Sequence, residues 1–349
     1  MDWHSSRVTR FRYVKVDAAT MAEAGEVRDT FTDGGEVEYN DLTAIKATGR
    51  LPFIRPPDVG FDYLRVYASL TQGGEAEELM LGTYIVSTPS SSVRGAVRSG
   101  EAAVYSLLQV AADAAATEPV SIPAGTRAVA AAAGYVRALG LRCVADTSDA
   151  ELHAAANWKA GTSWLEVVNW LCAVAGFGSA GVDAAGSVTL ARYTDPANRA
   201  PTVELSSGGR ALFRPEVAYD LDIFDVPNVV IAVMSNEAGD LVATARNDDP
   251  LSVYSTVSRG REIAHLEEVS DIAGPAELAA LAERLLAQKT SAVESVEVEH
   301  AFLPYQTGEV ARLDWPEAGF SFTGACVRKA VSLTPSMSCR SRFRRFVRM

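Results

Sequence analysis

The first hundred residues alternate between apolar and polar side chains. Residues 11–17 mix aromatic or aliphatic with polar positions in this way, and two longer apolar stretches, 61–70 and 79–86, flank a turn at residues 72–74 that contains two glycines. A period of two is typical of strands with one buried face, and glycines tolerate the positive φ of tight turns. Several strands at this spacing predict a small antiparallel barrel or sandwich over residues 1–100.

The apolar period lengthens in the next part of the chain. Apolar residues within 101–116 recur at helical spacing, which predicts a helix there. A second helix is expected to begin with Thr126 as its N-cap and to stop at Gly140. A third helix has a capping box made by Ser163 and Glu166.

The third helix is expected to end at Gly176, and a hairpin with a turn at 183–186 follows it. Residues 176–181 also match the glycine spacing GxGxxG of dinucleotide-binding loops. That mechanism needs the glycines between a strand and the N-terminus of a helix, whereas here they follow a helix. A helix stop plus loop is the preferred interpretation, and residues 101–197 are predicted to form an α+β module.

Strands dominate again from about residue 198. The near-continuous apolar run at 229–234 predicts a central strand, and a helix at about 275–289 has Pro275 in its first turn. The strand at 293–302 alternates valine with glutamate. We therefore predict a β-rich α+β fold with two barrel-like antiparallel β domains, 1–100 and 198–340, the α+β module between them, a late C-terminal helix, and a basic tail at 341–349.

Net charge restricts the possible partners. The chain has 349 residues, enough for two or three domains, and a formal charge of −12. An acidic body argues against nucleic-acid binding, which needs clustered lysine and arginine. No apolar run is long enough for a membrane span, and the N-terminus lacks the apolar core of a secretion signal, so we expect a soluble chain made in a cytoplasm.

The last ten positions break the acidic trend. They hold five arginines, which are the candidate partner-docking residues of this sequence: Arg340, Arg342, Arg344, Arg345 and Arg348. One interpretation is a solubilising or poorly ordered tail, and the other is a docking peptide for an acidic partner surface.

Residues that carry catalysis or bind metals are not arranged in any recognisable pattern. The cysteines form no CxxC pair, the histidines form no HxxxH spacing, and no GxSxG or phosphate-binding loop occurs. Asp220, Asp222 and Asp225 could supply oxygen ligands to calcium, but the same segment alternates like a strand with a solvated face. We expect no cofactor and no catalytic residues.

The order of short signatures resembles the hub proteins of long-tailed bacteriophages, similar to the baseplate hub of contractile tails and the siphophage tail-tip hub. The signatures in this chain include an Asp-x-x-Gly hairpin at Asp183 and a Tyr-x-x-Pro stretch at Tyr193. The other segments that carry the resemblance are 120–126, 158–171, 226–231 and 308–313. Some relatives append a lysin or peptidase domain, and the chain ends at Met349 without one.

The resemblance implies a structural virion protein and not an enzyme. It implies a homotrimer at the phage tail tip, assembled in the host cytoplasm, that adapts the sixfold tail tube to the threefold tip and lines the DNA ejection channel. The implied partners are a distal tail protein or the tail tube, the tape measure protein, and tip or fibre proteins. DNA would pass transiently without specific binding, because an acidic lumen repels phosphates. Two alternatives stay open: an acidic-residue glycan- or peptidoglycan-cleaving tail enzyme, and a distal tail or host-adhesion module.

Overall fold

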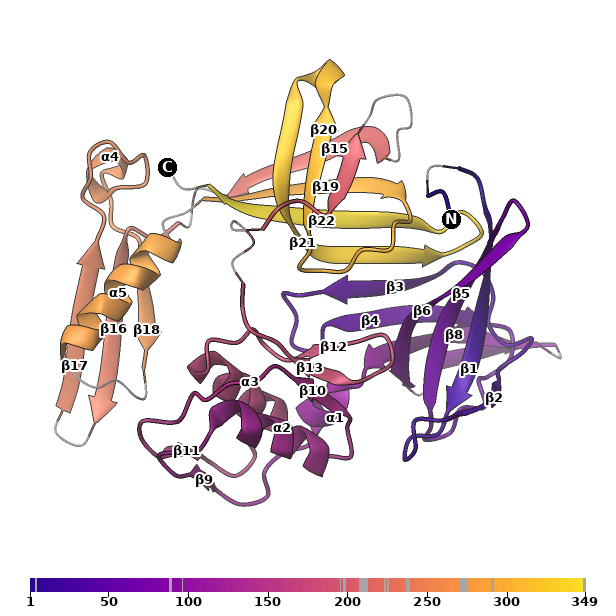
Figure 1. Cartoon of the computed structure of the whole chain (residues 1–349), viewed down its shortest axis with the longest axis horizontal. Helices are drawn as coiled ribbons and strands as arrows, with labels where there is room; N and C mark the ends of the chain where they lie inside the picture. The colour runs from indigo at the N-terminus through magenta and orange to yellow at the C-terminus, as the bar shows by residue number, and fades with distance from the viewer. Residues whose placement is uncertain are drawn as a thin grey trace. The chain divides into compact units, whose positions relative to one another are not determined.

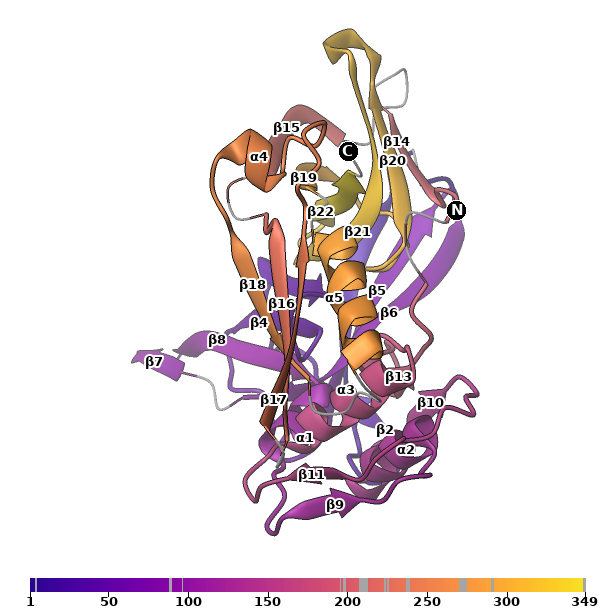
Figure 2. The ribbon, with the colours of Figure 1, turned by 90° about the vertical axis from the view of Figure 1, so that its left-hand side faces the viewer.

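The computed structural model is β-rich, with few helices (Figures 1 and 2). It describes the chain except residues 4, 88–89, 96, 195, 197–198, 207–212, 223, 225, 237–238, 270–274, 290–291 and 348–349, and the side chains of a few adjoining strand and helix residues. This confirms the predicted β-rich α+β class. The described strands form large antiparallel sheets, and no closed barrel is present among them.

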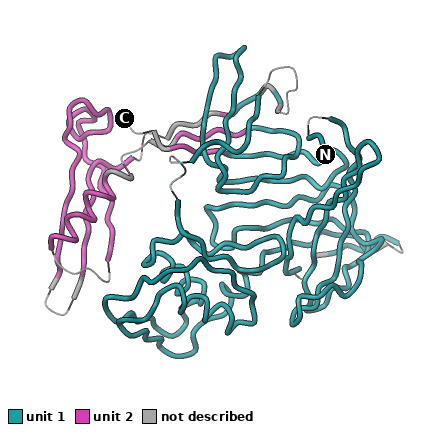
Figure 3. Tube along the Cα trace, viewed as in Figure 1, with its two compact units in different colours: residues 1–217, 298–342 teal, residues 218–297, 343–349 magenta. Residues whose placement is uncertain are grey.

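The chain divides into two compact units, coloured separately in Figure 3. Unit 1 comprises residues 1–217 and 298–342, and unit 2 comprises 218–297 and 343–349. These limits differ from the boundaries expected near residues 100, 197 and 340. The reason is that strands from both ends of the chain share one sheet and one core within unit 1.

The N-terminal part of unit 1 is a run of antiparallel strands. They lie in the order β3-β4-β8-β6-β5-β1-β2, and β7 pairs only with β8. Their bounds are β1 (Val8–Val16), β2 (Glu23–Glu26), β3 (Gly35–Asn40), β4 (Ala47–Phe53), β5 (Tyr63–Gln72), β6 (Glu75–Val86), β7 (Ser90–Arg94) and β8 (Val97–Ser106). The expected antiparallel strands of residues 1–100 are therefore present.

The C-terminal strands continue this sheet. β21 pairs antiparallel with β3, with Leu333 opposite Gly35, so yellow and purple ribbons lie side by side in Figure 1. The strands of this part are β14 (Val203–Ser206), β15 (Phe213–Asp222), β19 (Ala292–Ala301), β20 (Val310–Trp315), β21 (Phe320–Leu333) and β22 (Ser338–Val347), with a short helix η2 (Pro316–Ala318). Val331 and Leu333 share one buried cluster with Val37 and Leu51, so the two ends contribute to the same core.

The α+β module of unit 1 packs three helices around its own apolar core. α2 and α3 contribute half of the buried residues, including Val136, Val168 and Leu171. The elements are α1 (Leu108–Asp113), β9 (Val120–Ile122), α2 (Ala128–Ala138), β10 (Cys143–Ala145), β11 (Ala156–Trp158), α3 (Trp164–Val174), β12 (Gly181–Val182) and β13 (Val188–Leu190).

Local signals for two of these helices are confirmed. Ser163 caps α3 by accepting a hydrogen bond from the Glu166 N–H at 3.2 Å, and Gly176 follows the helix with φ of +70°. Gly140, with φ of +79°, follows α2 in the same way. Thr126 is not the N-cap, however. Its hydroxyl donates to the Pro123 carbonyl, and α2 begins two residues later.

The predicted helix at 101–116 is wrong over most of its length. Residues up to Ser106 belong to strand β8, and only 108–113 are helical. Ala102, Val104 and Ser106 are all buried, so a period of two was also present in the segment. Pairing with β4 and β6 decides the conformation, because tertiary contacts override weak local preference.

Arg65 joins the sheet to the α+β module. From strand β5 its guanidinium donates to the Thr83 hydroxyl at 2.9 Å, to a Glu23 carboxylate oxygen at 3.3 Å and to the Ala185 carbonyl at 3.3 Å. The Thr83 hydroxyl in turn donates to the Ala184 carbonyl at 2.9 Å. The predicted turn at 183–186 is thus held directly against β5 and β6.

Unit 2 is built on a three-stranded sheet with the order β17-β16-β18. Its elements are β16 (Val229–Asn236), β17 (Gly239–Arg246), α4 (Thr256–Arg259), β18 (Ala264–Glu268) and α5 (Pro275–Lys289). Leu278 and Ala282 of α5 pack on Val230 and Ala232 of β16. The run at 229–234 is the central strand, as predicted. Among the described residues, no helix combines the length and apolar content that a membrane span requires.

Replacing Gly186 by alanine should destabilise the docked turn. Gly186 has φ of +89°, and an added Cβ would lie 2.8 Å from a Leu107 methyl and 3.1 Å from the Met21 methyl. Gly161 has almost the same φ, +90°, with open space around it. We expect Gly161→Ala to cost about 1–2 kcal/mol from backbone strain, and Gly186→Ala to cost a further 1–3 kcal/mol or so from overpacking. Urea unfolding measures both, and equal losses would contradict the packing argument.

Candidate functional site

The most concentrated polar chemistry lies in a buried cluster of unit 1. His300, Tyr305 and Ser341 form a triangle in which His300 Nε2 lies 2.9 Å from Ser341 Oγ and 2.8 Å from the Tyr305 hydroxyl. The Tyr305 hydroxyl donates to Ser341 Oγ at 2.6 Å. A serine beside a histidine resembles a nucleophile and its base. All three side chains are buried, however, so this pair is closed to a substrate.

Burial sets the charge of His300. Desolvation lowers its pKa from 6.5 to about 4, so the ring is neutral at physiological pH. Its Nδ1 lies 2.6 Å from the Ala301 carbonyl oxygen, which places the ring proton on that nitrogen and leaves Nε2 to accept. The triangle therefore acts as a satisfied buried network that joins β19 to β22.

Lys329 is a second buried polar group of unit 1. From β21 its ammonium donates to the Leu303 carbonyl at 2.6 Å and to the Tyr305 carbonyl at 2.7 Å. It also lies 4.1 Å from the centroid of the Tyr305 ring, and desolvation lowers its pKa. Since both carbonyls are in the segment after β19, Lys329 fixes the path of the chain there.

A cavity of about 260 Å³ opens beside Lys329. Its lining includes Tyr39 and Tyr84, whose hydroxyls both donate to the Leu81 carbonyl. The carboxylate in the lining is Asp183, which accepts the Ser187 N–H at 2.7 Å. These polar groups thus have partners within the fold, and among the described residues no group of histidine, cysteine and acidic side chains is placed to hold a metal ion.

The arginine-rich C-terminal segment is part of strand β22. Cys339, Ser341 and Phe343 are buried on one face of this strand, so the expectation of a poorly ordered tail is wrong up to Val347. Arg345 donates to the buried carboxylate of Glu294. Four of these arginines make contacts within the chain: Arg340, Arg342, Arg344 and Arg345. The fifth, Arg348, lies outside the described residues. A docking role for them stays a prediction.

The aspartates considered for calcium are not tested by the structure. Asp220 and Asp222 lie in β15, as the alternating pattern predicted, but their side chains are outside the described set. Asp225 lies wholly outside it.

Sequence analysis missed an open apolar face in unit 2. Side chains alternate across a sheet, so Ile231 and Val233 point away from α5, and the residues paired with them on that face are Leu266 and Val242. Leu266 is 56% exposed and Val242 is 60% exposed. We call these four residues the open sheet face. The continuous apolar run at 229–234 was the available signal, because such a run indicates a strand covered on both sides, and α5 covers only one.

A second exposed apolar patch surrounds helix α4. Leu251 is 91% exposed, and Phe224, Val253 and Val257 are also exposed. Arg261 holds the Phe224 ring, with its guanidinium carbon 4.5 Å from the ring centroid. Exposed apolar groups gathered in this way are typical of a surface that contacts another protein.

No family model matches the chain, and no curated protein matches it. Solved structures do. A tail protein from Neisseria meningitidis MC58 superposes with a TM-score of 0.67 at 12% identity, over 98% of this chain and 97% of that one. The 43 kDa tail protein of prophage MuSo2 from Shewanella oneidensis superposes at 0.64 and 11% identity, over 95% and 98%.

A chain of the Francisella PdpA–VgrG complex is also similar, with a TM-score of 0.54 and 10% identity, over 97% of this chain and 53% of that one. At these identities the likeness establishes a common fold. The resemblance to tail hub proteins that the sequence suggested is therefore confirmed at the level of fold.

The His300 network predicts a pH-dependent stability. The folded pKa of about 4 lies below the unfolded value of 6.5, so the unfolded chain gains the proton first as pH falls. Stability present above 6.5 should decline by about 3 kcal/mol between these two values. His300→Gln should remove that part of the decline in urea unfolding followed across pH, whereas the exposed His153→Gln should not. An unchanged slope in His300→Gln would refute the assignment.

Proposed function

We propose that this chain is a structural phage tail protein, the trimeric hub at the distal end of the tail. The observation that carries the proposal is the fold, which two tail proteins share over nearly their whole length. A structural match over the whole chain supports a similar architecture of the assembled protein more strongly than a match over one part of the chain would.

The surfaces of the chain support assembly with other subunits. The open sheet face leaves Val242 and Leu266 exposed beside half-buried Ile231 and Val233. Burying apolar area of this kind favours association by about 25 cal/mol per Å² before the entropic costs of binding. Copies joined by a heterologous contact form a ring when the rotation closes, and a threefold ring is the form that the hub resemblance implies.

Two β-rich parts per chain suit the adaptor role. In a trimer, the N-terminal strands of each copy and the C-terminal strands that continue their sheet would supply six groups of strands, which would match a sixfold tail tube on one side and a threefold tip on the other. The proposed partners are accordingly a distal tail protein or the tail tube, the tape measure protein, and tip or fibre proteins. A virion location at the tail tip, after assembly in the host cytoplasm, follows from the same role.

Charge supports a passive DNA conduit. The chain carries −12 at neutral pH, so a lumen with the average charge of this chain repels phosphate and lets DNA pass without specific contacts. A glycan-cleaving tail enzyme would instead need two convergent carboxylates in a cleft. The cavity described above has one carboxylate in its lining, already bonded to a backbone N–H. The hub is thus the better-supported function.

Native mass spectrometry of the purified chain tests the hub directly. We expect a species at three times the 37.1 kDa chain mass, alone or after addition of a distal tail protein. Electron microscopy of the same sample should show threefold rings. A chain that remains solitary under both conditions, or that forms an even-numbered closed assembly, would argue against the hub.

A further inference from the structure

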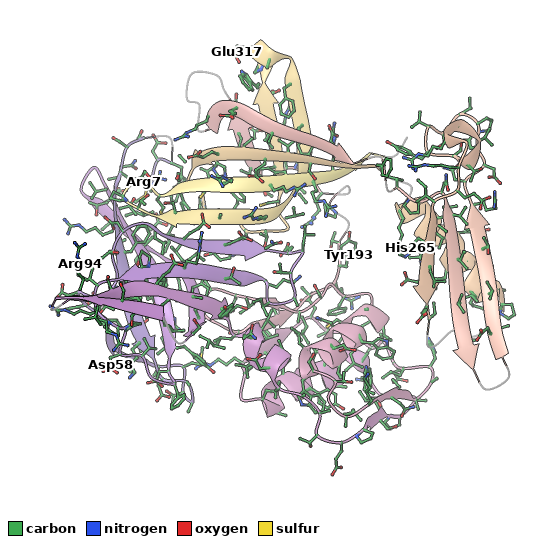
Figure 4. The ribbon with its side chains drawn as sticks, turned by 180° about the vertical axis from the view of Figure 1, so that it is seen from behind. Arg7, Asp58, Arg94, Tyr193, His265 and Glu317 are labelled. Carbon is green, nitrogen blue, oxygen red and sulfur yellow. The ribbon has the colours of Figure 1, made fainter. Side chains whose placement is uncertain are left out.

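Strands β7 and β8 form a hairpin that leaves the sheet. β8 pairs with β4 only from Gly100 onward, where Gly100 lies opposite Phe53. Before that point β8 pairs with β7 alone. Figure 2 shows the hairpin projecting from the rest of unit 1, and Figure 4 places Arg94 at its outer end. We call residues 90–99 the arm.

Among its described residues, the arm is exposed along strand β7. Ser91, Ser92, Val93 and Arg94 are all exposed, and Val93 is 71% exposed. Because successive residues of a strand point to opposite faces, both faces of the arm are open. A two-stranded hairpin is marginally stable in water, and the outer edge of β7 offers unpaired backbone groups to another strand. A second chain that adds to this edge would supply what the arm lacks.

The charge of the arm indicates an acidic partner. Between residues 87 and 100 the charged side chains are Arg94 and Arg98, while the chain as a whole carries −12. A second copy of this chain therefore provides a surface of the opposite sign. Opposite charge across an interface raises the association rate and suppresses wrong partners.

Strand β18 is a free edge that fits the arm. It has five residues, as β7 does, and pairs on one side only, with β16. It offers Glu267 and the exposed Leu266, which lie on opposite faces of the strand as Arg94 and Val93 do, and which match them in charge and polarity.

Other free edges match less well. β2 is four residues long, its pairing with β1 is bulged, and it has no large apolar side chain. Bulges and charge at an edge are devices that discourage pairing. β17 carries both signs of charge, at Asp240 and Arg246, and the apolar residues of β14 are buried.

We propose that the arm of one copy adds to strand β18 of a second copy and extends its sheet by β-augmentation. This inference rests on the proposed trimer and names the contact that closes it. The arm and β18 are different surfaces, so the contact is heterologous, and three such contacts close a ring. Backbone hydrogen bonds along the edge give affinity, and the arginine–glutamate and Val93–Leu266 contacts give register.

Charge reversal tests the contact. Arg94→Glu combined with Arg98→Glu should raise the dissociation constant of the assembly at least about tenfold, measured by analytical ultracentrifugation. Adding Glu267→Arg to that variant should restore most of the affinity. Arg127→Glu, an exposed arginine of the α+β module, is the matched control and should leave the dissociation constant unchanged. Circular dichroism should show all three variants folded, since every substituted side chain lies at the surface of the chain.

Cross-linking tests the geometry. Cys143→Ser removes the half-buried native thiol, and the other three cysteines are buried. In this background, Val93→Cys with Leu266→Cys should yield two-chain and three-chain products with a short bismaleimide. Val93→Cys paired with Val144→Cys, at an exposed site of the α+β module, should not.

The outcomes distinguish failure of the arm contact from failure of the hub proposal. Suppose that the wild-type chain forms a trimer and that the double arginine reversal leaves the mass and the dissociation constant of the assembly unchanged. The arm contact is then wrong, and the hub proposal stands. Cross-links between the Val93→Cys sites of two chains, or cross-links within one chain, also contradict the arm contact. A wild-type chain that never forms trimers refutes the hub itself.

Discussion

The buried guanidinium of Arg65 is the interaction on which the arrangement of unit 1 depends. Its three hydrogen bonds reach β6, the Glu23 carboxylate of β2 and the turn of the β12–β13 hairpin. A buried cation is costly unless its donors are satisfied, so each partner must be in place together. Gly186 allows the turn to approach this closely, because any side chain there would meet Leu107. The sheet and the helical module therefore fold as one body and not as two linked domains.

The second constraint is that both ends of unit 1 share a core. β21 completes the N-terminal sheet through β3, and Lys329 on the same strand holds the segment after β19 by two carbonyls. His300 and Ser341 then link β19 to β22. These buried polar groups lie where distant parts of the chain meet, and their full satisfaction specifies that meeting. Chemistry that resembles a catalytic pair is here used for structure.

Signals that act within a few residues could be predicted from the sequence. The Ser163 cap, the helix stops at Gly140 and Gly176 and the central strand at 229–234 depend on local geometry and periodicity, and all are present. The segment 101–106 was misassigned because its apolar residues satisfy two periods at once, and pairing with β4 selects the strand. The arginine-rich segment of β22 was predicted to be a tail for a similar reason. Their composition suggests a tail, whereas the alternating Cys339, Ser341 and Phe343 indicate a strand. The sharing of one sheet by both chain ends has no local signal.

Assembly surfaces made of strand edges and apolar faces leave a faint mark in a sequence. An edge binds through backbone groups that every residue except proline possesses, so no residue type is required at a given position. What can be detected is an imbalance of polarity or charge. One example is a strand that is apolar on both faces but covered on one, and another is a basic hairpin on an acidic chain. In the proposed assembly, each imbalance marks a surface that residues of a second subunit would cover.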